Sequence, residues 1–241
     1  MIELSAQVYA AELRRFRSIG CVWLAADEIP ADIEVPAGWR ELLAVPDDML
    51  ADRLMQMWAG VIDRLPAIAR FFRDKLARPA VFRNDGGEVM LLYPYTVEQD
   101  DLNFFIGRAP LRERAPLDEP VWRALPGDLQ RFHQAVHDGW TFFPARSMGP
   151  LPLGDQTTLT DKLDLTPAET RKLGVNPDLV RTVLHNGGGD YLCVDLRDSA
   201  GDGSRAGRIW WHEQPARLEP VDFWAAMNAW FDIFVEDADE R

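Results

Sequence analysis

Two histidines with helical spacing are the first residues of this sequence that could do chemistry. His133 and His137 lie four residues apart in a segment with a helical pattern, so their rings would share one helix face. Such a pair can bind zinc, and in metalloproteases a glutamate after the first histidine activates the metal-bound water. Here Gln134 follows His133, and no third ligand is evident. We expect surface or capping histidines; a metal-dependent hydrolase that uses His133 and His137 is an alternative.

Three aspartates lie just before or within a glycine-rich segment further along the chain. Asp195, Asp198 and Asp202 could hold a hard cation, but their spacing lacks the EF-hand pattern, which favours solvated loop acids. The segment Gly201–Gly207 lies between two predicted strands instead of opening a helix, so it indicates a hairpin loop and not a dinucleotide site. Walker A and Gly-x-Ser-x-Gly motifs are absent from the sequence. The sequence therefore predicts no catalytic residue, metal or cofactor, and no enzyme.

Adjacent tryptophans are candidates for a protein contact. Trp210 and Trp211 fall on a predicted strand, so their side chains must point to opposite faces. One can enter a core, and the other is either covered by a helix or exposed. An exposed tryptophan beside acidic residues is typical of protein–protein contacts.

The elements that must position these residues follow from hydrophobic periodicity and turn signals. The first predicted helix follows Ser5, and a long helical segment runs from Asp47 to Leu76 with a break at Pro66. Another helix covers Gly127–His137, and two more start at Thr166 and at Asn176. The last helix begins at Pro220 and has a buried stripe of Phe223, Met227, Trp230 and Phe234. The predicted strands are Ile19–Ala26, Ala80–Arg83, Glu88–Tyr95, Leu102–Gly107, Trp140–Phe143, Asp190–Leu196 and Arg208–His212. Helices and strands occur in separate runs, which predicts the α+β class.

One internal similarity links two of these hairpins. The sequence from Val81 to Glu88 resembles the sequence from Val183 to Asp190, and each precedes an apolar strand. A duplicated unit would produce this pattern. Two unrelated glycine-rich turns are the simpler interpretation.

Composition limits the class of protein. The chain has 241 residues, of which 47% are hydrophobic and 27% charged, which is typical of a globular protein with one large core or two small ones. Its 39 acidic and 26 basic residues leave a net charge of −13, so nucleic acid and anionic membranes would repel it. Cys21 and Cys193 lie in apolar runs, and we expect two buried free thiols. Without a signal-peptide pattern or an apolar span, we expect a cytoplasmic protein.

The second half of the chain shows a recognisable order of features. These are Leu125-Pro126, a predicted helix at Asp128–His137, the segment Asp138-Gly139-Trp140-Thr141-Phe142, the strand Gly188–Leu196, the strand Gly207–His212 and a terminal helix from Val221. Over roughly residues 119–235 this order resembles the SUKH superfamily, which includes yeast cell-wall-synthesis regulators of the Smi/Knr type and bacterial immunity proteins. Residues 1–118 depart from it.

The resemblance implies an α+β fold with a mixed or antiparallel sheet flanked by helices, and a non-enzymatic binding role. It predicts a SUKH-like α+β domain at residues 119–241. Residues 1–118 are then an N-terminal α+β region of unassigned type, either a divergent second unit or part of one continuous domain.

The functional prediction is a cytoplasmic bacterial immunity protein that neutralises a cognate toxin or effector protein by stoichiometric occlusion. A charge of −13 would steer it towards a basic partner, but the acidic residues are spread over both halves of the chain, so the charge does not identify the class of toxin. The candidate contact residues are Trp140, Asp198, Asp202, Trp211, Asp237 and Asp239. A regulatory or scaffolding module of the same fold, without a toxin, is the other alternative. The sequence leaves the oligomeric state open.

Overall fold

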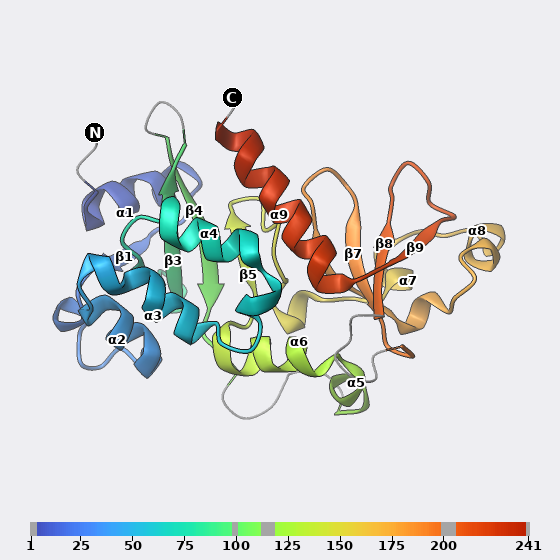
Figure 1. Cartoon of the computed structure of the whole chain (residues 1–241), viewed down its shortest axis with the longest axis horizontal. Helices are drawn as coiled ribbons and strands as arrows, with labels where there is room; N and C mark the ends of the chain where they lie inside the picture. Colours follow the sequence, from blue (N-terminus) through green and yellow to red (C-terminus); the bar gives the residue numbers. More distant parts are fainter. Residues whose placement is uncertain (1–3, 98–100, 112–118, 199–205, 240–241) are drawn as a thin grey trace.

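Two antiparallel sheets organise the computed structural model, which describes residues 4–97, 101–111, 119–198 and 206–239 (Figure 1). The first sheet has the strand order β1-β2-β3-β4-β5, with β1 (Gly20–Trp23), β2 (Ala80–Asn84), β3 (Val89–Thr96), β4 (Leu102–Arg108) and β5 (Trp140–Phe143). The second has the order β6-β7-β8-β9, with β6 (Val180–His185), β7 (Tyr191–Asp195), β8 (Gly207–Trp210) and β9 (Leu218–Val221). The predicted α+β class is confirmed.

Helices lie on the faces of both sheets (Figure 1). They are α1 (Ala6–Arg15), α2 (Ala37–Ala44), α3 (Leu50–Met57), α4 (Pro66–Asp74), α5 (Glu119–Ala124), α6 (Gly127–Arg131), α7 (Leu159–Lys162), α8 (Pro167–Lys172) and α9 (Phe223–Asp239). Ser5 caps α1, and Pro66 occupies the first turn of α4, where its missing N–H costs nothing. Thr166 and Glu169 form a capping box at α8, so the predicted helix starts after Ser5 and at Thr166 are confirmed, whereas the helix expected to reach Pro66 ends earlier, at Met57.

The first sheet is covered on both faces. Helices α2, α3 and α4 contribute to the core on one face, where Tyr93, Phe105 and Trp140 are fully buried. Helix α1 covers the other face through Tyr9 and Leu13, which are fully buried in a smaller cluster. The alternation of side chains along each strand assigns neighbouring residues to these two clusters.

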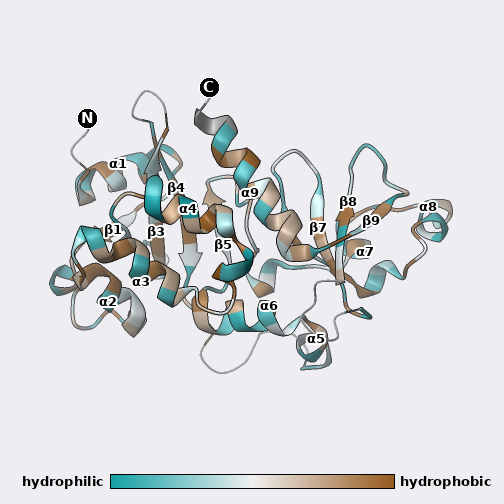
Figure 2. Cartoon of the chain, in the orientation of Figure 1, coloured by the Kyte–Doolittle hydropathy of each residue, from teal (hydrophilic) through white to brown (hydrophobic). Residues whose placement is uncertain are grey.

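Helix α9 connects the two sheets. It packs against α4 and also against β7 and β8, so its buried residues share one core with both sheets (Figure 1). On the opposite face of the second sheet, Leu159 of α7 and Leu173 of α8 form a separate cluster with Cys193 and Trp210. Figure 2 shows tan and brown residues along the first turns of α9, as a helix between two sheets requires.

Three local predictions are wrong. Asn176 starts only a single 3-10 turn, and the chain then enters strand β6, which pairs with β7. Pro220 belongs to the short strand β9, which the sequence analysis missed, and α9 begins at Phe223. Cys21 is exposed, because β1 is an edge strand of the first sheet, whereas Cys193 is buried as expected.

The predicted boundary at residues 118/119 does not separate the two sheets. Strand β5 follows that boundary in sequence, yet it pairs with β4 through Phe105↔Phe142 and Gly107↔Trp140. The division between the sheets falls between Phe143 and Val180. Even there, one hydrophobic cluster continues from the first sheet to the second.

The two similar sequence segments form hairpin turns of the same construction. Asn84 Oδ1 accepts from the backbone N–H of Glu88 at 2.9 Å, and Asn186 Oδ1 accepts from that of Asp190 at 3.1 Å. In each turn the residue before the acid is a glycine with positive φ, 85° at Gly87 and 107° at Gly189. The similarity therefore reflects a shared turn geometry, which glycine adopts without strain.

Candidate functional site

The two histidines do not form a shared site. Helix α6 continues into a π-helical turn (Phe132–Val136), and His137 follows it with an extended backbone. Both imidazoles are fully buried, so the expectation of surface or capping histidines is wrong. His133 Nε2 lies 3.1 Å from Gln156 Nε2, whereas His137 Nε2 lies 2.6 Å from Tyr93 Oη. The rings are thus held by different partners, and the geometry of a metal-binding pair is lost.

His137 belongs to a continuous chain of buried hydrogen bonds. Its Nδ1 lies 2.9 Å from the carbonyl oxygen of Arg108, which can only accept, so Nδ1 carries the proton. Nε2 then accepts from the Tyr93 hydroxyl, which itself accepts from Trp58 Nε1 at 3.1 Å. A side chain at Gly107 would collide with this ring, since a Cβ there would lie 2.4 Å from two of its atoms.

Burial sets the charge state of these groups. Desolvation lowers the pKa of His137 to about 4, against a small opposing effect of the Arg108 carbonyl. Desolvation also lowers the pKa of His133, although Asp138, whose Oδ1 is 3.2 Å from Nδ1, opposes the shift. Burial raises the pKa of Tyr93. Burial thus favours the neutral forms of both histidines and of Tyr93, and within the described residues no group of three His, Cys, Asp or Glu could hold a metal.

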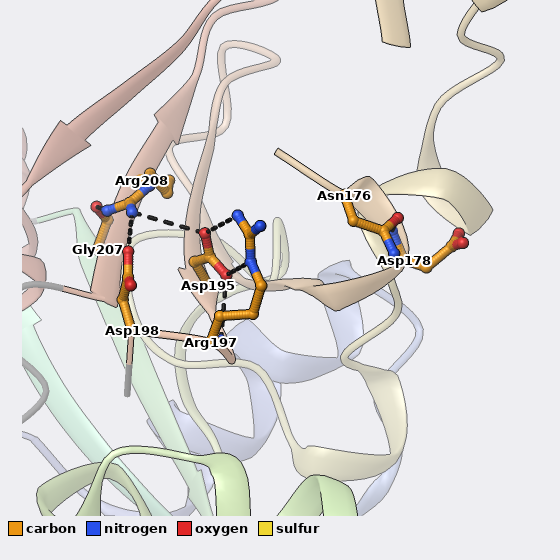
Figure 3. Close-up of polar contacts among 7 residues, drawn as sticks. All are labelled: Asn176, Asp178, Asp195, Arg197, Asp198, Gly207 and Arg208. Carbon is orange, nitrogen blue, oxygen red and sulfur yellow. Dashed lines mark hydrogen bonds and ion pairs between the residues drawn. The ribbon is translucent and has the colours of Figure 1, made fainter. Parts of the chain in front are cut away.

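The aspartates at the base of the β7–β8 loop are paired with arginines (Figure 3). Asp195 is fully buried and accepts from Arg197 Nε at 3.1 Å and Nη2 at 2.9 Å. Arg208 Nη2 lies 3.5 Å from the same carboxylate and also binds Asp198. Burial raises the pKa of Asp195, but the hydrogen bonds and charge of Arg197 and the charge of Arg208 outweigh it, so the pKa is lowered overall.

This pairing changes the interpretation of the acidic loop. Two carboxylates and two guanidinium groups balance one another, so Asp195 is not a solvated loop acid and the described part of the cluster offers no free carboxylate pair for a cation. Asp198 is half exposed but its charge is compensated by Arg208. Asp202 lies outside the described residues. Figure 3 also shows Asn176 and Asp178 apart from this network, where Asn176 Oδ1 accepts from the N–H of Asp178.

Trp140 cannot contact a partner, and this candidate is corrected. It is fully buried in the centre of the first sheet's core, with its ring stacked 4.3 Å from Phe105 and in edge contact with Trp58 at 5.0 Å. The reason lies in strand pairing: β5 joins β4 and turns Trp140 towards α4 and α9. Its contribution is to packing.

Trp211 is a surface residue with defined partners. Trp210 points to the α7–α8 face and is 7% exposed, while Trp211 points to the α9 face, as expected for neighbours on a strand. The Trp211 ring meets Trp230 of α9 in edge contact at 6.3 Å, and its Nε1 donates to Glu219 Oε2 at 3.0 Å. Both rings are partly exposed. A rigid aromatic pair is thus displayed at the surface with an acid beside it.

Of the predicted buried stripe of the last helix, Phe223 and Met227 are fully covered, whereas Trp230 and Phe234 are only partly buried against the core. The fully covered residues of α9 are Phe223, Trp224, Met227, Phe231 and Val235. The stripe is shifted because α9 packs against α4 on one side and against the second sheet on the other. The sequence contains one indication that Trp230 is partly exposed, because it lies in a segment with three alanines and Ile233. Ile233 itself is 56% exposed.

The remaining candidates lie at the end of the same helix. Asp237 and Asp239 belong to the last turn of α9, and their side chains lie outside the described part. The base of the β7–β8 loop lies near the other end of α9, because Gly207 pairs with Val221, two residues before the helix begins. Apart from Trp140, the candidate residues that can be placed therefore lie near α9 or in its last turn.

A cavity of about 190 Å³ opens elsewhere, on the face of the first sheet beside α1. Its charged lining is balanced: Arg108 Nε lies 2.6 Å from Glu88 Oε1, and Arg146 binds Asp155. It contains none of the candidate residues.

Among the helices of the described chain, none has the length and apolar character to cross a membrane. Comparison of the chain with protein-family models, curated proteins and solved structures found no match.

Proposed function

We propose that the protein is a bacterial immunity protein that binds a cognate toxin or effector in the cytoplasm and neutralises it by stoichiometric occlusion. The observation that carries this proposal is the half-buried Trp211–Trp230 pair, displayed at the surface with Glu219. Tryptophans with buried edges and a hydrogen-bonded indole dominate the binding energy of many interfaces. Their conformations are already held here, so little side-chain entropy is lost on binding.

Two further features support the proposal. The order of sequence features over residues 119–235 resembles a superfamily that contains immunity proteins. The net charge of −13 favours fast association with a basic toxin, an effect that weakens with salt. Fast association is useful to an inhibitor that must act before its target does.

The test begins with affinity capture of the tagged protein from its own source cells at low and high salt. The gene for the captured polypeptide is then expressed in a laboratory host alone and together with the protein. We expect the polypeptide alone to stop growth, co-expression to restore growth, and the purified complex to contain both chains in equal amounts. A harmless or housekeeping partner would instead support a regulatory or scaffolding module.

A matched pair of variants connects this test to the surface. Trp211→Ala removes one ring of the displayed pair, and Trp122→Ala removes a partly exposed tryptophan of α5. We expect Trp211→Ala to weaken the complex at least tenfold and Trp122→Ala to leave it within twofold. Equal effects of the two variants would count against the assigned surface.

A further inference from the structure

The outward side of α9 is apolar over most of its length. Ala225, Ala229 and Ile233 are exposed at intervals of four residues, and Ala226 and Trp230 beside them are partly exposed. The opposite side of the helix is buried in the core. A helix that is apolar on both sides is normally covered on both sides. In the described chain, the outward side has no cover.

The charged residues of α9 itself are all acidic. The helix contains no lysine, arginine or histidine between Phe223 and Asp239. Three cations near α9 are directed at the helix or at the residues before it: Arg70 binds Asp232 at 2.5 Å, Lys75 donates to the carbonyl of Val235 at 3.3 Å, and Arg217 Nη2 binds Glu219 Oε2 at 2.9 Å. The field over the outward side is therefore set by acidic residues.

These acidic residues lie at both ends of the helix. Glu219 and Asp222 precede α9, and Asp222 Oδ1 caps it by accepting from the N–H of Ala225 at 2.9 Å. Glu236, Asp237 and Asp239 occupy its last turn. Carboxylates at a helix C-terminus oppose the helix dipole, so the position of these acids does not favour the helix.

The charge distribution indicates which kind of partner can bind this surface. If two copies of the chain paired through α9, both the parallel and the antiparallel arrangement would bring acidic ends together. An anionic membrane would be repelled for the same reason. A polypeptide segment that carries Lys or Arg next to aliphatic or aromatic side chains matches both the apolar centre and the acidic ends.

We propose that the outward side of α9, formed by Ala225, Ala226, Ala229, Trp230 and Ile233 with Trp211 at its edge, docks a basic, partly apolar segment of a partner protein. The identification of that partner as a toxin rests on the function proposed above. The apolar residues supply the desolvated centre of the interface, and the acidic ends set its orientation.

The experiment uses a photo-crosslinking amino acid, p-benzoylphenylalanine, in the full-length protein in its source cells. It is placed at Ala229 on the outward side of α9 and, as the control, at Ala168, an exposed alanine of α8. After irradiation the adducts are digested and sequenced by mass spectrometry. We expect an adduct from residue 229 to a segment rich in Lys or Arg, and none to that segment from residue 168.

The other outcomes overturn the proposal in distinct ways. An adduct from residue 229 to a second copy of this chain, to lipid or to an acidic segment shows a different occupant. If the protein captures a toxin but residue 229 forms no adduct, the surface is wrong and the proposed function stands. If neither an adduct nor a toxin is found, both fail.

Affinity measurements with the crosslinked partner provide an independent readout. Ala229→Arg places a cation on the outward side, and Ala168→Arg places the same side chain on α8. Both positions are exposed, so both variants should fold with an unchanged circular-dichroism spectrum. We expect Ala229→Arg to lower affinity at least tenfold and Ala168→Arg to change it less than twofold; equal effects would overturn the proposal.

Discussion

At the scale of single residues, the molecule uses its polar side chains to complete the core. His137 and Tyr93 are buried among aromatic rings, and each polar atom of the Trp58–Tyr93–His137 chain has a partner. Such a chain costs little when it is complete and a great deal when it is interrupted. His133 and His137 are therefore buried core residues.

The lowered pKa of His137 makes stability depend on pH. In the unfolded chain this histidine takes up a proton near its ordinary pKa of 6.5, whereas in the folded protein it does so only near 4. Between these values the unfolded state binds more protons, so the free energy of unfolding falls as pH decreases from about 6.5 to 4. Over this range the loss attributable to His137 is up to about 3 kcal/mol, at about 1.4 kcal/mol per pKa unit.

Urea denaturation at pH 7 and at pH 4.5 measures this loss, and His137→Gln is the comparison. Glutamine keeps a donor and an acceptor but does not titrate, so the variant should be less stable at pH 7 and lose less stability on acidification. An equal loss in both proteins would show that His137 does not contribute. His133 and His185, whose pKa values are also lowered by burial, contribute to the remaining slope in the variant.

Tyr93→Phe tests the same chain without changing a titrating group. Removal of the hydroxyl leaves Trp58 Nε1 and His137 Nε2 without their partners in a buried site. We expect the free energy of unfolding to fall by about 1–3 kcal/mol. Tyr191→Phe, at a partly exposed tyrosine of β7, is the control and should have a smaller effect.

At the scale of elements, α9 combines two tasks that oppose each other. Its inward residues join the two sheets, while its last turn carries acids that disfavour the helix. An element of this kind is less stable than its packing would allow. This is expected where charge is retained for binding.

Neutralising the acidic end of α9 should change stability and binding in opposite directions. Asp237→Asn with Asp239→Asn removes two charges that oppose the helix dipole, so the free energy of unfolding should rise by about 0.6–2 kcal/mol for the pair. Binding of the basic partner should weaken in the same variant. Thermal denaturation and calorimetric titration measure the two effects. A fall in stability would show that the acids have structural partners.

At the scale of the whole molecule, one core extends across both sheets. Phe105 of β4 and Trp140 of β5 contact Phe231 of α9, which lies in the same cluster as Val183 and Leu192 of the second sheet. Chain segments far apart in sequence thus complete each other's buried surface. The two halves of the sequence share one hydrophobic cluster.

We therefore expect neither residues 1–118 nor residues 119–241 to fold alone. The first fragment lacks β5 and α9 and would expose the apolar face of β3 and β4, and the second would leave β5 without its partner strand. Near-ultraviolet circular dichroism and denaturant titration of each fragment and of the full chain measure this. Cooperative unfolding of either fragment would contradict the expectation.

The sequence by itself determined those features that depend on neighbouring residues. Ser5 and Thr166 cap helices, Pro66 marks a break between helical segments, and apolar runs form β2, β3, β4, β7 and β8 at nearly the predicted positions. The α+β class followed from the same local patterns. The separation of Trp210 from Trp211 also followed, because consecutive side chains of a strand must point to opposite faces.

Only the tertiary structure decided the features that depend on distant residues. The pairing of β5 with β4 buried Trp140, and a π-helical turn directed His133 and His137 to different partners. Strand β6 replaced a predicted helix because β7 was available to pair with it. The buried side of α9 could not be inferred from its own residues, since a helix that is apolar on both sides is oriented only by what it packs against. Its outward side, our proposed docking surface, became visible for the same reason.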